Sequence, residues 1–488
     1  MRIEKIPSIY LAFIPLAILI ILLMGGIYVY GDDVQGGALQ ISLLLAAAVA
    51  AIIGMLNGIS WLELQKSFVQ SISTALGSIM VLLIIGSLIG TWLAAGTIQT
   101  IIFYALQALN AEMFFFSACL ICMFVSLCIG GSWATIATVG VAMLAAASTM
   151  GVSIPITTGA VISGAYFGDK MSPLSDTTNL APAVVGVDLF VHIRHMVWTT
   201  LPSITISLII FLILGFTSST EGAMPVSGTL ALLEANYAIQ WHALLPLIII
   251  LFLAFRKTPA VPAIAVSTVV GALYALTFQR PLLLQFIGET DLPLFLTYMK
   301  AVWTIMFDGY ISQTGNATLD SLLSRGGMSS MLNTIWLIIT ALFFGGIMER
   351  TGLLNSLLKA ILSGVTSLGG LVVRTVVACI GTNIIAPDQY ISVVLPGRMF
   401  RKAYEDRGLA PQNLSRILED AGTLTSPLVP WNTCGAFIAG ALGVPTLTYL
   451  PFCFFNLINP LVSMLYGIFN IRFDPLEDEE KSEAVPQE

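Results

Sequence analysis

Charged residues are scarce in this chain of 488 residues, where they make up 10% of the total, against about 25% in an ordinary globular protein. Hydrophobic residues make up 57%, compared with about 45–50% in such proteins. With so little charge, a chain of this length cannot present a polar surface to water. The composition therefore excludes a water-soluble fold.

The chain also lacks an excess of positive charge. Its formal net charge is −7, and most of that charge comes from residues 474–488, where seven acidic residues accompany one lysine. Binding to the phosphate backbone of a nucleic acid requires a clustered surplus of Lys and Arg. We therefore expect no nucleic-acid partner and interpret the acidic segment as a solvated tail.

Cysteine and histidine are few as well, with six and three residues. Cys119 and Cys122 form a C-x-x-C pair inside an apolar segment, and we interpret them as packing residues. His192 and His195 precede an apolar run, which predicts an interfacial turn or, alternatively, a pH sensor. The sequence contains no zinc-protease, nucleophile-elbow or phosphate-loop motif. These absences argue against an enzyme, and we expect no cofactor.

Long apolar runs, in contrast, are abundant. A helix needs about 20 apolar residues to cross the hydrocarbon core, so the runs predict an all-α polytopic membrane protein with about ten crossings. The first run is longer than a signal-peptide core of about 7–15 residues, and we expect it to remain as a membrane span. The runs cover residues 8–30, 38–56, 72–95, 155–187, 197–216, 241–255, 260–277, 331–348, 413–442 and 446–469.

Two apolar stretches, 113–150 and 370–401, are each close to two helices long and carry a glycine-polar step midway. The first step is Gly130-Gly131-Ser132 and the second is Gly381-Thr382-Asn383. Irregular backbone at membrane depth is tolerated only where protein or a water-filled cavity satisfies its amides. We therefore predict two re-entrant hairpins.

The distribution of Lys and Arg predicts the orientation. The loop at 256–257, the cluster at 398–407 and the amino terminus are basic, whereas residues 217–240 contain no Lys or Arg. Basic loops face the cytoplasm, so we expect both termini there and residues 217–240 outside. This topology requires the short segments 97–109 and 353–365 to lie along the interface.

The two halves of the sequence resemble each other. Gly90-x5-Gly96 matches Gly346-x5-Gly352, and two further local matches, at Cys128 and at Ser172-Pro173-Leu174, recur in the same order at offsets between 251 and 256. Together with the topology, this predicts two inverted repeats, an arrangement that indicates a secondary transporter. The predicted order is a cytoplasmic N-terminus at 1–7, a first repeat at 8–217 (hairpin 113–150, broken helix 155–187), an external linker at 218–240, a second repeat at 241–470 (hairpin 370–401, broken helix 413–442) and an acidic cytoplasmic tail at 471–488.

The densest polar segment, residues 168–179, interrupts an apolar run. Pro173 removes a helical donor, so the segment cannot be one continuous helix. Na⁺ prefers oxygen ligands, which this segment supplies in quantity. An extramembrane loop with Asp176 as a helix N-cap is the alternative. The candidate ligands are Asp169, Ser172, Asp176, Thr177, Thr178 and Asn179.

The matching segment of the second half, residues 419–433, is equally polar and contains a Pro-x-x-Pro break. Acidic groups inside a membrane are functional-site hypotheses by default. Glu419 can simply face the basic cytoplasmic cluster, so we favour Asp420. The neutral candidates here are Thr423, Ser426, Asn432 and Thr433.

The predicted hairpin tips add further candidates, Ser132 and Trp133 in the first half and Thr382, Asn383 and Asp388 in the second. A buried carboxylate can hold Na⁺ in its ionised form or a proton in its neutral form, which is the antagonism an exchanger needs. Asp388 can instead form a structural pair with Arg398 or Lys170. Our predicted ion-coupling carboxylates are Asp169, Asp176, Asp388 and Asp420, and the predicted direct Na⁺ ligands are Asp176, Asn179, Asn383 and Asn432.

Two long motifs carry a family resemblance. Gly168-Asp169-Lys170-Met171-Ser172-Pro173-Leu174-Ser175-Asp176-Thr177-Thr178-Asn179-Leu180-Ala181-Pro182 resembles the signature of the NhaC family of Na⁺/H⁺ antiporters, and the motifs between Asp388 and Gly435 are similar to that family too. The resemblance implies a bacterial inner-membrane exchanger of Na⁺ and H⁺ with an elevator-type motion, often as a dimer. Superfamily relatives carry Ser-Asn-Thr motifs at the hairpin tips, which Thr382-Asn383 matches in part and Gly131-Ser132 does not.

Other cargoes stay open, because the same family includes exchangers of organic acids, such as malate for lactate, and members that handle amino acids. An organic anion would bind to hydroxyls and helix amino termini, with Trp133 or Trp431 as a stacking wall. A passive channel explains the repeated broken helices less well.

Overall fold

The computed structural model describes residues 7–30, 36–218, 226–256, 258–364 and 366–476. Within these ranges the chain is nearly all helical, and the β pairing consists of two isolated bridges. The all-helical class predicted from the apolar runs is therefore confirmed. Most of the predicted acidic tail and part of the predicted external linker lie outside the described residues.

Nine helices in the described part of the chain are long and apolar enough to cross a membrane, and the number rises to eleven if each of two sharply bent pairs counts as a span. The expected number of crossings lies in this range, and the chain is a multi-pass membrane protein. The long spans contain α1 (Ile9–Tyr30), α2 (Ala38–Leu56), α4 (Leu76–Ala95), α6 (Phe114–Ile129), α7 and α8 (Ser132–Thr135, Val141–Thr149), α11 (Leu189–Thr217), α14 (Ala260–Phe278), α18 (Leu332–Arg350) and α20 (Leu368–Ile385).

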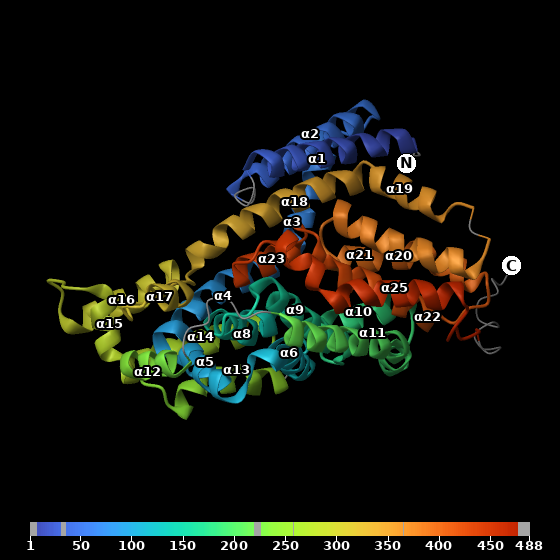
Figure 1. The fold of residues 1–488 in the computed structure, drawn as a ribbon. Coiled ribbons are helices and arrows are strands. Elements are labelled where there is room, and N and C mark those ends of the chain that lie inside the picture. The colour runs from blue at the N-terminus through green and yellow to red at the C-terminus, as the bar shows by residue number, and fades with distance from the viewer. Residues whose placement is uncertain (1–6, 31–35, 219–225, 257, 365, 477–488) are drawn as a thin grey trace.

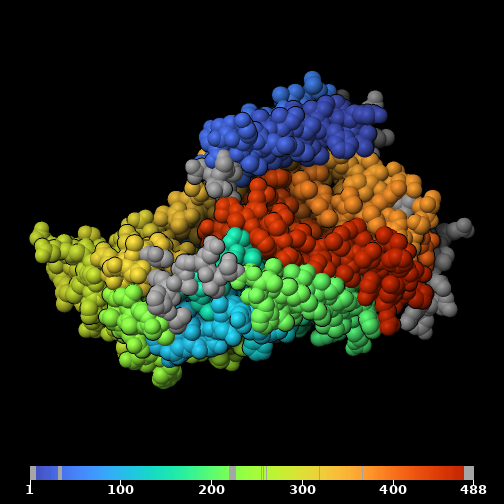
Figure 2. All heavy atoms as spheres, in the orientation of Figure 1, coloured from blue at the N-terminus to red at the C-terminus, as the bar shows by residue number. Residues whose placement is uncertain are grey.

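The spans differ in how deeply they are buried. In α1 only 22% of the most apolar window is covered by protein, and large side chains such as Tyr10, Ile21 and Tyr28 are exposed. In α4 the corresponding share is 72%. Figure 2 shows α1 and α2 as a ridge along one edge of the molecule. Exposed apolar side chains on peripheral helices are the expected contact with lipid, which takes the place of water there.

The remaining helices are shorter and fill the space around these spans (Figure 1). At the narrow end of the molecule, α12, α15, α16 and α17 project away from the body. The bent pairs are α12 with α13, at 84°, and α23 with α24, at 90°. The bounds are α3 (Trp61–Thr74), α5 (Thr97–Ala108), α12 (Val226–Asn236), α13 (Leu245–Phe255), α15 (Arg280–Ile287), α16 (Leu294–Asp308), α17 (Ala317–Leu323), α19 (Leu353–Leu362), α24 (Thr446–Tyr449) and α25 (Phe454–Ile468).

The polar segment of the first half separates two helices. Within this segment, residues 168–179, α9 (Ile154–Met171) ends and α10 (Asp176–Val185) begins, with residues 172–175 between them. We call residues 172–175 the first interruption. The predicted hairpin break nearby is also present, since α6 ends at Ile129 and α7 begins at Ser132. A Cβ on Gly130 would come within 2.5 Å of Leu174, so the two breaks pack directly on each other.

In the second half, α20 and α21 (Gln389–Glu405) are followed by α22 (Pro411–Leu418) and the π-helical turn η6 (Glu419–Thr423). Helical geometry continues through residues 424–425 and a 3-10 turn at 426–428, and the chain leaves it at 429–432 before α23 (Thr433–Leu442) begins. We call residues 424–432 the second interruption. The first half has a π-helical turn too, η3 (Ile136–Gly140), between α7 and α8.

The predicted break at Gly381-Thr382-Asn383 is wrong, because α20 continues through it to Ile385. Thr382 donates to the Ala378 carbonyl one turn earlier and so remains compatible with a helix. The chain breaks at 386–388 instead. Proline disfavours helical geometry in the residue before it, and Asp388 caps the next helix through the backbone N–H groups of Tyr390 and Ile391.

The repeat predicted from the sequence has local counterparts in the structure. α4 ends at Gly96, with φ of +77°, and α5 follows, while α18 is followed by Gly352, with φ of +72°, and then by α19. Both glycines adopt the left-handed geometry that ends helices. Ser-Pro-Leu occupies both interruptions, at 172–174 and at 426–428.

Candidate functional site

The last turn of α9 carries two charged side chains that are buried. Asp169 accepts a hydrogen bond of 2.7 Å from Ser132, the first residue of α7. Lys170, fully buried, points to the second half of the chain. Because α6 packs along α9 and α7 also contacts it, the helices on both sides of the Gly130-Gly131 break position this turn.

Side chains in and next to the first interruption form hydrogen bonds with the backbone groups that the two helix ends leave free. The Thr178 hydroxyl donates to the carbonyls of Asp169 and Lys170, at 3.0 Å each, which are among the carbonyls left free where α9 ends. Ser175 accepts from the Thr178 N–H as the N-cap of α10. Ser172 donates to the Leu127 carbonyl on α6. These residues therefore hold the two helix ends together.

An ion pair joins Lys170, in the last turn of α9 before the first interruption, to Asp420, in η6 before the second, although 250 residues separate the partners. Asp420 Oδ1 also accepts from Thr199 on α11, at 3.1 Å, and from Asn459 on α25, at 2.8 Å. All four side chains are fully buried. The two polar segments that the sequence singles out thus meet in the interior.

Glu419, next to Asp420, is fully buried too, but neither of its carboxylate oxygens has a hydrogen-bond partner. The hydroxyl of Thr423 and Asp420 Oδ2 are likewise buried and unpartnered. All three residues belong to η6. π-helical turns are rare and occur frequently at functional sites. The η6 turn therefore contains more buried oxygen atoms than the surrounding protein supplies with hydrogen-bond donors.

A pair of asparagines links α20 to the start of α23. Asn432 donates to Asn383 Oδ1 at 3.0 Å and, through its own Oδ1, caps α23 by accepting from the Cys434 N–H. Asn383 donates to the carbonyl of Gly422 in η6 at 2.7 Å. Both asparagines are fully buried. The end of α20 is in this way tied to the second interruption on both sides.

Asp388, predicted as an ion-coupling residue or as the partner of a cation, acts as the N-cap of α21. Among the described residues no ion pair joins it to Arg398 or Lys170, so that alternative is wrong. α21 packs against α10, the helix that begins at Asp176.

The four predicted Na⁺ ligands divide into two separate pairs. Asn383 and Asn432 are buried and bonded to each other, whereas Asp176 and Asn179 are exposed. The Asn179 amide donates to the carbonyls of Pro173 and Ser175 and so braces the first interruption. In the described part of the chain no hydrogen bond joins one pair to the other. The suggestion that Asp176 is an N-cap is wrong, because Ser175 takes that position.

The remaining candidates mostly complete local contacts. Thr177 shares a hydrogen bond with Ser175, and Ser426 donates to the Thr423 carbonyl. The Thr433 N–H donates to the Pro387 carbonyl at the break between α20 and α21. Trp133 stacks on Phe437 with ring centroids 4.2 Å apart, and Trp431 donates to the Ile384 carbonyl. The Trp431 N–H is thus satisfied by the protein, whereas the Trp133 Nε1 atom is buried without a hydrogen-bond partner.

The interfacial turn predicted for the two histidines is wrong, because both are buried. His192 Nδ1 lies 2.8 Å from the Ser415 hydroxyl. His195 Nε2 lies 3.5 Å from Asp474 and 3.5 Å from the buried guanidinium of Arg416. These contacts attach α11 to α22, one turn before η6.

Sequence reasoning gave no ion-binding role to Lys170, Glu419, Thr199 or Asn459. Lys170 stood within the recognised motif but had no identifiable partner there, and Glu419 was set aside in favour of Asp420. Asn459 could have been identified from the sequence, because a side-chain amide in an apolar helix needs a polar partner. Thr199 could not, since threonine bonds readily to its own helix.

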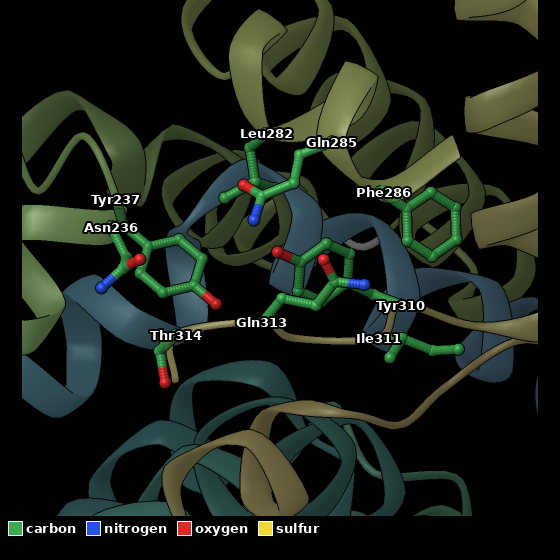
Figure 3. Close-up of a pocket in the computed structure, with 9 residues that line it drawn as sticks. All are labelled: Asn236, Tyr237, Leu282, Gln285, Phe286, Tyr310, Ile311, Gln313 and Thr314. Atoms are coloured by element: carbon green, nitrogen blue, oxygen red, sulfur yellow. The ribbon is translucent and has the colours of Figure 1, made fainter. Parts of the chain in front are cut away.

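One pocket of the molecule lies elsewhere, between α12, α15 and the loop that follows α16 (Figure 3). It contains none of the candidate residues. Its lining is Asn236, Tyr237, Leu282, Gln285, Phe286, Tyr310, Ile311, Gln313 and Thr314.

Comparison with known proteins identifies the family. The model of the Na⁺/H⁺ antiporter family matches residues 164–471, which include both interruptions. The chain belongs to this family. The Na⁺/H⁺ antiporter NhaC of Alkalihalophilus pseudofirmus is 38% identical over 88% of this chain and 90% of its own length. The resemblance inferred from the motifs is therefore confirmed.

Other members of the antiporter family carry different names. The malate-2H⁺/Na⁺-lactate antiporter of Bacillus subtilis is 33% identical over 88% of this chain and 89% of its own length. The arginine/ornithine antiporter ArcD of Halobacterium salinarum is 35% identical over 98% of this chain and 96% of its own length. All three relatives are antiporters, in keeping with the prediction that the chain is not an enzyme.

Proposed function

We propose that this protein exchanges Na⁺ for H⁺ across the membrane as a secondary active transporter. The observation that carries the proposal is the buried Lys170–Asp420 pair, which joins the end of α9 to η6, the two turns that lead into the interruptions. Charged groups inside a membrane are expensive and mark ion pathways. Helices interrupted in corresponding places provide ion sites near the middle of transporters. The family membership and the NhaC relative support the same activity.

The pair supplies a way to couple the two ions. Asp420 is held by the Lys170 ammonium, and in so buried a place a second cation beside the first would raise the electrostatic energy steeply. Loss of a proton from the cluster removes one positive charge and allows Na⁺ to bind to carboxylate oxygens. Na⁺ and H⁺ therefore compete for the same place, which is the condition for exchange.

We assign ion coupling to the four carboxylates predicted from the sequence, with Asp420 first because it joins the two halves. Asp169 is next, since it is buried beside Lys170 and bonded to Ser132. Asp388 and Asp176 border the same region from α21 and α10.

We further propose that the two halves are inverted repeats and that exchange proceeds by an elevator-type motion of a transport domain against a scaffold. The matched left-handed glycines after α4 and α18, and Ser-Pro-Leu in both interruptions, support the repeat. The bias of Lys and Arg supports termini on the cytoplasmic side of an inner membrane.

The test uses purified full-length protein in liposomes that contain a pH dye. Addition of Na⁺ is expected to drive proton flux, Li⁺ and K⁺ serve as comparison cations, and Asp420→Asn is expected to abolish the Na⁺-driven signal. Normal Na⁺-driven flux in Asp420→Asn would remove Asp420 from the mechanism. Absence of Na⁺-driven flux in the unaltered protein would overturn the proposed exchange.

Exchange of an organic solute is the second candidate, and the names of two relatives favour it. Uptake of labelled malate, lactate, arginine or ornithine against a Na⁺ gradient in the same liposomes separates this candidate from inorganic exchange. Solute uptake without Na⁺-driven proton flux would replace the first candidate by the second.

A further inference from the structure

The two carboxylates at the start of η6, Glu419 and Asp420, differ in their hydrogen-bond and ion-pair partners. Asp420 has a counter-charge and two further donors on one oxygen. Glu419 is equally buried and has no donor on either oxygen. An ionised carboxylate that is buried without a partner is strongly destabilising, so this group must bind either a proton or a cation.

Neutral oxygens lie around Glu419. Thr423 lies in the same turn with its hydroxyl buried and without a partner, and Thr177 lies buried on α10, which packs against η6. Asp420 is the next residue of η6, Lys170 reaches this turn from α9, and the buried Arg416 precedes it on α22. In the described part of the chain Lys170 pairs with Asp420, and no ion pair joins Glu419 to Lys170 or to the buried Arg416 at the end of α22.

We propose that Glu419 is the carboxylate that binds the transported Na⁺, with the hydroxyls of Thr423 and Thr177 as neutral ligands. Carboxylate and hydroxyl oxygens are the donors that hard cations prefer. The π-helical turn widens the backbone at this position and leaves these side chains without internal partners. The inference rests on the proposed Na⁺/H⁺ exchange and deepens it by naming the ligands of the cation.

The site differs in kind from the Lys170–Asp420 pair. At Asp420 the protein provides its own positive charge, whereas at Glu419 the positive charge must come from outside. Proximity of the two then explains coupling, because Na⁺ on Glu419 and the ammonium of Lys170 repel each other within one buried cluster.

The experiment measures binding of radiolabelled Na⁺ to the purified full-length protein, separately from transport. Glu419→Gln keeps the size of the side chain and removes its charge, so the Na⁺ concentration for half-saturation is expected to rise at least about tenfold. Glu112→Gln, which neutralises an exposed carboxylate on another element, is the matched control and is expected to bind as the unaltered protein does.

Two further variants keep the test decisive if Glu419→Gln fails to fold. Glu419→Asp retains the charge but shortens its reach, and Thr423→Val removes one hydroxyl at nearly constant volume. Both are expected to weaken Na⁺ binding by less than the loss of the charge does. Half-saturation at the unaltered Na⁺ concentration in the folded Glu419 variants would overturn the proposed site.

The two measurements separate the proposed Na⁺ site from the proposed exchange of Na⁺ for H⁺. If the unaltered protein exchanges Na⁺ for H⁺ while Glu419→Gln still binds Na⁺ normally, the site at Glu419 is wrong and the exchange stands. If the unaltered protein binds Na⁺ through Glu419 but shows no Na⁺-driven proton flux, the site stands and the proposed exchange is wrong.

Discussion

The two interruptions share a Ser-Pro-Leu motif but differ in chemistry. In the first, no buried polar side-chain atom between residues 168 and 179 lacks a partner, and hydroxyls close the free helix ends. In the second, the π-helical turn that leads into it leaves four buried acceptor atoms unsatisfied. The first half thus contributes a rigid break and a lysine, and the second contributes anionic oxygens. Similar breaks in sequence therefore do not have equivalent roles.

The largest effect is expected from separating the charges that join the halves. Lys170→Met leaves Asp420 buried without its counter-charge, and breaking a buried pair in this way destabilises a protein by about 3–5 kcal/mol. Thermal unfolding in detergent measures the loss. The double variant Lys170→Met/Asp420→Leu is expected to recover most of it, because neither charge then remains. A double variant no more stable than Lys170→Met would show that the pair does not link the halves.

A smaller difference is expected between the two helix caps. Ser175 and Asn432 are the N-caps of α10 and α23, and loss of either cap is expected to destabilise the protein by about 1 kcal/mol. Asn432→Ala also removes the bonds to Asn383, so we expect it to be less stable than Ser175→Ala by about a further 1 kcal/mol. A higher unfolding temperature for Asn432→Ala than for Ser175→Ala would contradict the conclusion that the two interruptions differ.

The smallest effect is expected at Asp176, which is exposed at the start of α10. Asp176→Asn removes no contact that the described structure shows, so the unfolding temperature is expected to stay unchanged. The same variant in the liposome assay tests its predicted part in ion coupling. A clear loss of Na⁺-driven flux with unchanged stability would place the ion pathway on this exposed side of the first interruption.

Much of the fold could be predicted from the sequence, because crossing a membrane is a local property of about 20 residues. The break at Gly130-Gly131 and the one around Pro173 were predictable for the same reason, since they follow from backbone stereochemistry. The break assigned to residues 381–383 was wrong because Asn383 bonds to η6, 39 residues further along, and a helix can then accommodate it.

The candidate site could be predicted only in part. Asp169, Asp420 and the two asparagines were named, and the structure brings each of them into the buried polar region. Asn179 and Asp176 were named with equal reason and are exposed. The residue type indicates that a side chain can bind an ion. Whether that side chain is buried depends on neighbours from α11, α20 and α25, and the local motif does not predict where those helices lie.

The sequence by itself determined that this is a membrane protein and that its helices break at two related polar segments. Hydropathy and the backbone geometry of proline and glycine are local properties, which act over a few residues. Only the tertiary structure decided which carboxylate has a partner. Lys170 can neutralise one acid, and packing brings Asp420 to it from 250 residues away while Glu419, one position earlier, is buried without a counter-charge. In a low-dielectric interior that difference in position governs the energy of a charge, and no local pattern encodes it.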